Sequence, residues 1–158
     1  MEIRFAQNKD IPGIIELLKQ VGQVHHEGRP DIFRPGTQKY DENEVAEIIK
    51  NPQAPVFVAV KAGKVLGYCF CVLTEHHGER AMTDRKELYI DDLCVDEGCR
   101  GQGVGKILYG EVVRFAKRIN CAFITLNVWC CNAPAMLFYE KLGLTPRKIN
   151  MEMALEEN

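Results

Sequence analysis

A glycine-rich turn over residues 100–106 is the part of the sequence best suited to binding a ligand. It reads Arg-Gly-Gln-Gly-Val-Gly-Lys and stands between a strand-like segment and a strongly amphipathic helical one. Glycines let a backbone come close to a ligand, and the first turn of a helix offers unpaired N–H groups at its positive end. This glycine turn is therefore predicted to bind a phosphate or pyrophosphate, with a tight strand-to-helix connection as the structural alternative.

Two common phosphate-binding motifs do not fit the glycine turn. A P-loop requires a glycine five residues before its Gly-Lys pair and a Ser or Thr after it, where this chain has Arg100 and Ile107. A dinucleotide-binding Gly-x-Gly-x-x-Gly motif requires a glycine at position 106, where Lys106 stands. Both motifs are excluded.

Three carboxylates occupy the strand-like segment before the glycine turn, at Glu87, Asp91 and Asp92. Acids inside an apolar strand are costly unless they are exposed or paired. Each one alone could be solvated or salt-bridged. Strand alternation places Glu87, Tyr89 and Asp91 on one face and Asp92 on the other.

Hydrophobic periodicity predicts the elements that hold these residues in place. Strands are expected at residues 2–6, 56–60, 65–73, 87–95 and 122–129, with one or two more within 145–155. Helices are expected after caps at Asp10, Asp41 and Asn132, and from Val104 to Ile119. This order of elements predicts one mixed α/β domain over residues 1–158.

The stretch from Gly22 to Tyr40 shows no sustained periodicity, and Gly28, Pro30, Pro35 and Gly36 interrupt it. An irregular stretch of this length inside a compact domain is usually a functional loop or lid. We therefore expect a loop over this whole range.

Two motifs together resemble the GNAT superfamily of N-acetyltransferases. The glycine turn matches the family signature R-G-x-G-x-G, and residues 132–144 read NAPAMLFYEKLGL, close to the family pattern N-x-x-A-x-x-F-Y-E-K-x-G-F. The motifs occur in the family's order and at its separation, and the resemblance covers essentially the whole chain. It implies a mixed, mostly antiparallel sheet of about six to seven strands, flanked by about four helices.

The resemblance also implies that acetyl-CoA is the co-substrate and that no metal is needed. In the family the glycine turn binds the pyrophosphate through backbone amides, and the preceding strand pairs with the pantetheine arm. The residues implied for acetyl-CoA binding are Leu93, Cys94, Val95, Arg100, Gly101, Gln102, Gly103, Val104, Gly105, Lys106, Asn127, Asn132, Ala135 and Tyr139.

Catalysis would need a base for the amine and an acid for the leaving thiolate. A free alkyl amine is about 99.9% protonated at pH 7 and must lose a proton before it attacks. Tyr139 matches the family residue that donates to the leaving sulfur, with packing on a helix face as the structural alternative. Three acids beside the implied CoA site favour a patch that binds an amine. Glu87, Asp91 and Asp92 are all candidates for the base, because a family bulge in their strand would alter its register.

The segment Tyr89–Val95 resembles the Y-L-E-D-F-F-V run of spermidine/spermine acetyltransferases, which favours a small amine as acceptor. A polyamine, a diamine or an aminoglycoside-like compound is the leading prediction. The alternatives are acetylation of protein N-termini or lysines, and a CoA-binding regulatory module without catalysis. The resemblance allows a homodimer, although nothing in the residues requires one.

Composition limits the partners and the cellular location that we expect for the protein. The 158 residues carry a formal net charge of −2 with no basic cluster, so no nucleic-acid partner is expected. The start is charged from Glu2 onward, and the apolar runs are too short to span a bilayer, so neither a signal peptide nor a membrane is expected. The seven cysteines suit buried, reduced thiols rather than disulfides, and no spacing with the histidines supports zinc. A cytoplasmic protein is predicted.

Overall fold

The computed structural model describes residues 1–155, which form two compact units. The first unit is Met1–Asn127, and the second begins at Val128. The expectation of one domain over residues 1–158 stays a prediction.

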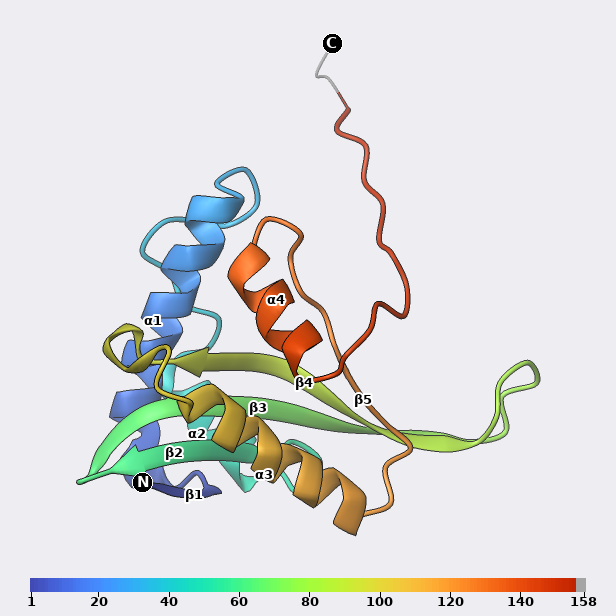
Figure 1. The fold of residues 1–158 in the computed structure, drawn as a ribbon, viewed down its shortest axis with the longest axis horizontal. Coiled ribbons are helices and arrows are strands. Elements are labelled where there is room, and N and C mark those ends of the chain that lie inside the picture. Colours follow the sequence, from blue (N-terminus) through green and yellow to red (C-terminus); the bar gives the residue numbers. More distant parts are fainter. Residues whose placement is uncertain (156–158) are drawn as a thin grey trace. The chain divides into compact units, whose positions relative to one another are not determined.

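The first unit is built on one five-stranded sheet in the order β1-β2-β3-β4-β5 (Figure 1). The strands are β1 (Glu2–Phe5), β2 (Val56–Lys61), β3 (Lys64–His76), β4 (Arg85–Val95) and β5 (Phe123–Leu126). Neighbours are antiparallel except β4 and β5, which run parallel. The mixed, mostly antiparallel sheet is confirmed. It has fewer strands than the expected six to seven, because residues 144–155 form none.

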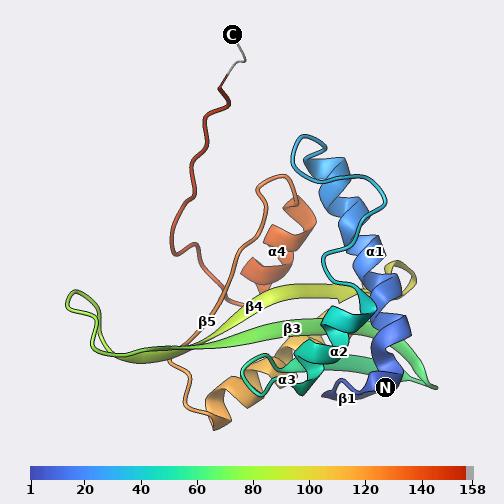
Figure 2. The ribbon, with the colours of Figure 1, turned by 180° about the vertical axis from the view of Figure 1, so that it is seen from behind.

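Three helices cover the sheet of the first unit. Helices α1 (Ile11–Gly28) and α2 (Glu42–Lys50) pack on one face, and α3 (Val104–Arg118) crosses the other, as opposite views show (Figures 1 and 2). On the α1/α2 face, Ile14 and Val45 join a buried cluster with Val58, and on the α3 face Val104 packs with Ala59. Adjacent residues of β2 thus supply both layers, as strand alternation requires.

Helix α1 is longer than the sequence predicts. It continues through Gly22 to Gly28, so the irregular loop covers only residues 29–41. A Cβ at Gly22 would collide with the carbonyl oxygen of Thr37. This glycine is therefore required by the close approach of the loop to the helix, and does not mark the end of the helix.

The predicted caps have different outcomes. At α2 the capping box is confirmed: the backbone N–H of Glu44 donates to Asp41 Oδ1 at 2.8 Å, and the N–H of Asp41 donates to Glu44 Oε2 at 2.8 Å. Asp10 does precede α1, but its carboxylate accepts no hydrogen bond from an amide of α1 and instead accepts one of 2.8 Å from the backbone N–H of Gln7. The Asp10 carboxylate also accepts two hydrogen bonds from the Arg4 guanidinium, at 2.7 and 2.9 Å, and Asp10 is 4% exposed.

The cysteines also have different environments. All seven are free, and Cys69, Cys71 and Cys94 are buried in the first unit. Cys130 and Cys131, however, are exposed, contrary to the expectation of buried thiols. The adjacent pair follows β5 outside any strand or helix, so no apolar layer covers it.

The second unit contains α4 (Ala133–Lys141). Its predicted cap is confirmed, because the backbone N–H of Ala135 donates to Asn132 Oδ1 at 3.2 Å. Pro134 lies in the first turn, where a missing N–H costs nothing. Gly143 follows the helix with a φ of 90°, the left-handed conformation typical of a helix end.

Candidate acetyl-transfer site

A bulge in β4 determines where its acids point. Phe70 of β3 pairs with Asp92, and the next residue, Cys71, pairs with Ile90, so Asp91 is an extra residue in β4. The bulge brings Asp91 and Asp92 to the same face of the sheet, the one covered by α1 and α2. The simple alternation that placed Asp92 on the opposite face is therefore wrong.

Asp91 is held by two residues of the loop before α2. The hydroxyl of Tyr40 donates to Asp91 Oδ2 at 2.6 Å, and Lys39 Nζ donates to Asp91 Oδ1 at 2.7 Å. The Asp91 side chain is 17% exposed, whereas that of Lys39 is 44% exposed. Burial, followed by the hydrogen bond to Asp91, holds the pKa of the Tyr40 hydroxyl well above its ordinary value. An ammonium group thus already lies on the Asp91 carboxylate.

Asp92 has a different environment although it is the next residue. Its Oδ2 accepts a hydrogen bond of 2.7 Å from the hydroxyl of Tyr68, which is fully buried. Burial raises the pKa of the Asp92 carboxyl to about 6, although the hydrogen bond from Tyr68 and the charge of Lys39 act in the opposite direction. A carboxylate with a pKa near 6 is a better proton acceptor at neutral pH than an ordinary one.

The two tyrosines that donate to these acids share an aromatic neighbour, Phe70. The Phe70 ring lies 5.4 Å from the Tyr40 ring and 5.1 Å from the Tyr68 ring, measured between centroids. Phe70 and Tyr68 belong to the buried cluster under α1 and α2, and Tyr40 packs against that cluster. The two tyrosine hydroxyls are therefore anchored on a rigid base, which fixes both carboxylates.

Glu87 lies farther along β4 and is bound to other partners. It is 7% exposed, and its Oε1 accepts a hydrogen bond of 2.7 Å from Arg85 Nε. His76 Nε2 lies 3.9 Å from its other carboxylate oxygen. The carboxylate of Glu87 is thus engaged in an ion pair at the opposite end of the strand from the bulge.

The glycine turn lies between β4 and α3 and is exposed along most of its length. Gly101 and Gly103 adopt left-handed φ values of 74° and 81°, and a Cβ at either position would meet open space. Gly103 immediately precedes α3, whose first N–H groups have no partner within the helix. Arg100 and Lys106 are exposed at the two ends of the turn. Open backbone amides, a helix N-terminus and two cations fit a pyrophosphate.

The end of β4 offers a free backbone edge beside this turn. Strand β5 pairs with β4 only from Glu87 to Ile90, so no strand of the described sheet pairs with Asp91–Val95 on that side. Leu93, Cys94 and Val95, the residues implied to pair with pantetheine, lie in this free stretch. Cys94 is buried, and burial raises the pKa of its thiol to about 12, so it is a poor nucleophile.

The remaining residues implied for acetyl-CoA binding lie in two places. Asn127 is exposed after β5, and its Nδ2 donates to the Tyr89 hydroxyl at 3.2 Å. Asn132, Ala135 and Tyr139 lie in the second unit, at the start and on the body of α4. Tyr139 is half-buried and its ring contacts that of Phe138 edge-on, with 5.1 Å between centroids.

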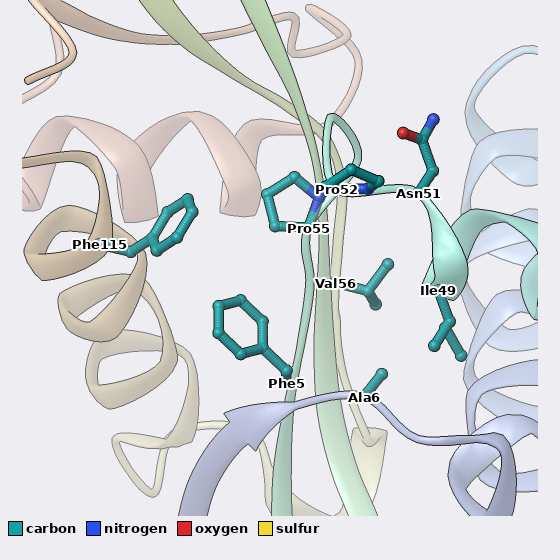
Figure 3. Close-up of a pocket in the computed structure, with 8 residues that line it drawn as sticks. All are labelled: Phe5, Ala6, Ile49, Asn51, Pro52, Pro55, Val56 and Phe115. Carbon is teal, nitrogen blue, oxygen red and sulfur yellow. The ribbon is translucent and has the colours of Figure 1, made fainter. Parts of the chain in front are cut away.

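Two hollows in the first unit lie outside the acid cluster. A cavity of about 260 Å³ at the ends of β1 and β2 is lined mostly by apolar side chains and carries no titratable one (Figure 3). A more polar hollow of about 460 Å³ lies between α1 and the glycine turn, and Arg100 and Glu97 line it. Arg100 thus faces an accessible space.

Sequence reasoning missed Lys39 and Tyr68 as partners of the acids. Lys39 lies 52 residues before Asp91 and Tyr68 lies 24 before Asp92, so only the folded sheet brings each pair together. Tyr68 could have been suspected, because a tyrosine within an apolar strand needs a partner for its hydroxyl. No local pattern marks Lys39.

Comparison with known proteins identifies the class. A model of the acetyltransferase (GNAT) family matches residues 21–144. The chain therefore belongs to the GNAT family of acetyltransferases, which use acetyl-CoA, as its two motifs predict.

Individual relatives support this assignment. The chain is 31% identical to a mutant of the BH1408 protein from Bacillus halodurans, whose crystal structure superposes with a TM-score of 0.95 over 99% of this chain and 100% of that one. A Bacillus subtilis protein, provisionally assigned as a ribosomal protein bS18-alanine N-acetyltransferase, is 29% identical over 63% of this chain. Streptothricin acetyltransferase from Streptomyces lavendulae is 34% identical over 37% of this chain.

These two relatives are matched over part of their length. The matched segments cover 60% of the Bacillus subtilis protein and 31% of the Streptomyces lavendulae protein.

Neither a membrane span nor a metal site is found among the described residues. None of their helices combines the length and the apolar character that a membrane span needs, and no group of three or more His, Cys, Asp or Glu side chains could hold a metal ion. The cytoplasmic location stays a prediction.

Proposed function

We propose that this protein transfers the acetyl group of acetyl-CoA directly to a primary amine of a small cationic molecule, such as a polyamine, a diamine or an aminoglycoside-like compound. The observation that carries the proposal is the acid pair of the β4 bulge. Asp91 already binds an ammonium, that of Lys39, at 2.7 Å, and Asp92 beside it has a pKa of about 6. One acid suits the binding of a cation, and the other suits the removal of its proton.

The roles of the residues follow from these environments. Asp91 holds the ammonium of the acceptor, and Asp92 accepts one proton from it, so that the neutral nitrogen can attack. Acetyl-CoA supplies the acetyl group as a thioester, held by residues 100–106 and by the free edge of Leu93–Val95. Tyr139 gives its proton to the sulfur as the carbon–sulfur bond breaks, and regains one from solvent.

Glu87 is the weakest of the three candidates for the base. Its carboxylate forms an ion pair with Arg85, whose side chain is 9% exposed. Removing Glu87 would leave a nearly buried guanidinium without this partner, so a loss of activity in a Glu87 variant would report on folding as much as on catalysis. Variants of Asp91 and Asp92 avoid this ambiguity, because an asparagine at either position can still accept the hydrogen bond from Tyr40 or Tyr68.

A second candidate function rests on the Bacillus subtilis relative, which is assigned to the acetylation of a protein N-terminal alanine. An N-terminal amine also needs a carboxylate and a base, so the acid pair suits both classes of acceptor. The two functions differ in the part of the acceptor beyond the amine.

The test is a thiol-release assay with acetyl-CoA and a panel of acceptors: spermidine, putrescine, an aminoglycoside, and peptides that begin with alanine. We expect turnover with a small cationic amine, and a drop in kcat of at least about 100-fold in Tyr139→Phe with little change in KM. Tyr109→Phe, a change on α3, is the matched control. Turnover of the peptides alone would favour the second function, and no turnover with any amine would overturn both.

A further inference from the structure

Two adjacent cysteines, Cys130 and Cys131, are the most accessible thiols of the described chain. Both are exposed, whereas the other five cysteines are buried or half-buried. The backbone N–H of Asn132 donates to the carbonyl oxygen of Trp129 at 2.8 Å, so the pair occupies the two central positions of a hydrogen-bonded turn. Cysteine is among the residue types most often buried, so packing does not explain an exposed pair.

The spacing of the two residues disfavours a disulfide between them. Consecutive Cα atoms lie about 3.8 Å apart across a trans peptide, below the minimum of about 4.4 Å that is usual for disulfides. A direct sulfur–sulfur bond would therefore strain the turn. An atom bound between the two sulfurs replaces that one bond by two and relieves the strain. The pair thus suits a bridging atom better than a disulfide.

The ligands at hand limit what the bridging atom can be. Thiol sulfur is a soft ligand and selects soft elements. A structural zinc site needs four protein ligands, and no group of three or more His, Cys, Asp or Glu in the described residues could hold a metal ion. Trivalent arsenic is satisfied by two sulfurs and one hydroxyl group, and arsenous acid brings that hydroxyl group with it.

We propose that Cys130 and Cys131 form a binding site for trivalent arsenic. Arsenous acid condenses with both thiols: two As–S bonds form, two As–OH bonds break, and each departing hydroxyl group leaves as water with one thiol proton. Arsenic stays trivalent, so the step needs neither an oxidant nor a reductant. The second As–S bond forms within one molecule, which makes the adjacent pair a far better ligand than any single thiol.

A second pair of thiols in the chain provides an internal comparison. The Sγ atoms of Cys69 and Cys71 lie 3.7 Å apart, and the two residues are 0% and 1% exposed. Both belong to β3, which lies between β2 and β4 in the sheet. Arsenous acid cannot reach this pair in the folded protein. Exposure therefore assigns the site to residues 130 and 131.

Occupation of the site should also affect helix α4. Cys131 directly precedes Asn132, whose side chain caps the helix, and Tyr139 lies about two turns farther along. A ring that joins the two cysteine side chains changes the turn that positions this cap. Acetyl transfer should therefore slow when arsenic is bound. This effect rests on the proposed function, whereas the binding of arsenic does not.

The test uses arsenous acid and the folded, fully reduced protein, with intact mass and free thiols as the readouts. One arsenic atom should bind per chain and protect two thiols. An excess of a monothiol should leave it bound, and a dithiol should remove it. Cys130→Ser and Cys131→Ser should each weaken binding at least about 100-fold, because each leaves a single thiol. Cys71→Ala, which breaks the buried pair, is the matched control and should not change the affinity.

Both serine variants change an exposed position, so they should fold as the natural protein does. Absence of bound arsenic in the natural protein would overturn the proposal, as would binding that either serine variant retains or that a monothiol displaces. A protein that binds arsenic through both cysteines but acetylates no amine would confirm the site and refute the proposed function.

Discussion

Asp91 and Asp92 are consecutive residues of a strand, yet both carboxylates lie on the same face of the sheet. Asp91 is the extra residue of the bulge opposite Phe70 and Cys71, and it faces Lys39 and Tyr40. Asp92 faces the buried Tyr68. The two acids therefore have different environments: one is paired with a cation, and the other is desolvated. Environments of this kind separate the roles of adjacent carboxylates in enzymes.

The pKa of Asp92 predicts the pH dependence of acetyl transfer. Because Asp92 must be ionised to accept a proton, kcat/KM should fall as the pH falls through about 6. The Asp92→Asn variant should lose at least about 100-fold in kcat, and its pH–rate profile should lack this fall on the acid side. The measurement is initial rate against pH at limiting acceptor concentration. An Asp92→Asn variant whose kcat/KM still fell near pH 6 would show that another group titrates there.

Asp92 should also make the protein less stable at neutral pH. Its pKa is raised in the folded state, so the native protein holds this proton more tightly than the unfolded chain does. Stability then decreases as the pH rises from about 4 to about 6. Asp92→Asn, which can still accept from Tyr68, should be more stable at pH 7 by on the order of 1–2 kcal/mol and nearly unchanged at pH 4.

Urea unfolding at both pH values measures this effect. Asp91→Asn is the matched control, and because it loses the ion pair with Lys39 it should show no gain at pH 7. Equal stability of Asp92→Asn and the natural protein at pH 7 would mean that the Asp92 carboxylate is well solvated.

Lys39 should compete with the acceptor for Asp91. Its ammonium lies 2.7 Å from Asp91 Oδ1, where we expect the ammonium of the acceptor to bind. Lys39→Ala should therefore lower KM for a cationic acceptor several-fold, and Asp91→Asn should raise it, each with a smaller effect on kcat. Steady-state kinetics against the acceptor measure both. Lys50→Ala, which removes an exposed lysine paired with Glu47 on α2, should change neither constant.

Local signals in the sequence predicted much of this fold. The capping box at Asp41 and Glu44 and the cap at Asn132 involve residues three apart, so their spacing alone identifies them. The left-handed glycines of residues 100–106 are local in the same sense. The sequence predicts too short an α1, because a glycine at position 22 is typical of a helix end. Only the contact with Thr37 in the folded chain explains it.

The environment of the acids could not be predicted in this way. The bulge at Asp91 is a property of the pairing between β3 and β4, and no residue type requires it at that position. Lys39 reaches Asp91 only because the loop before α2 folds back over β4. The missing strands of residues 145–155 have a similar cause: their alternation is present, but a strand also depends on backbone pairing with a neighbouring strand, which no local pattern specifies.

The pair of Arg4 and Asp10 should be a major source of stability at neutral pH. Two hydrogen bonds of 2.7 and 2.9 Å join the guanidinium to a carboxylate that is 4% exposed. The hydrogen bond from Arg4 lowers the pKa of Asp10, so its contribution is present above the unfolded value near 4 and is lost as the pH falls through the folded value.

Asp10→Ala should cost about 3 kcal/mol at pH 7, since it leaves the Arg4 guanidinium without its partner, and much less at pH 2. Denaturant unfolding at the two pH values measures the difference. Glu2→Ala removes a weaker ion pair, 3.9 Å from Arg4 and 70% exposed, and should cost little at either pH. A cost for Asp10→Ala that did not change with pH would mean that packing, rather than charge, holds this site.

Gly103 should matter for acetyl-CoA binding beyond its effect on the backbone. Its φ of 81° is unfavourable for any residue with a Cβ, so Gly103→Ala should cost about 1 kcal/mol of stability. A methyl group at this open position would also face the ligand bound at the N-terminus of α3, and KM for acetyl-CoA should rise at least about 10-fold.

Gly63 provides the matched control, because it has a φ of 79° in the turn between β2 and β3 and also faces open space. Gly63→Ala should show a similar loss of stability with an unchanged KM; equal KM values for the two variants would place the pyrophosphate elsewhere than residues 100–106.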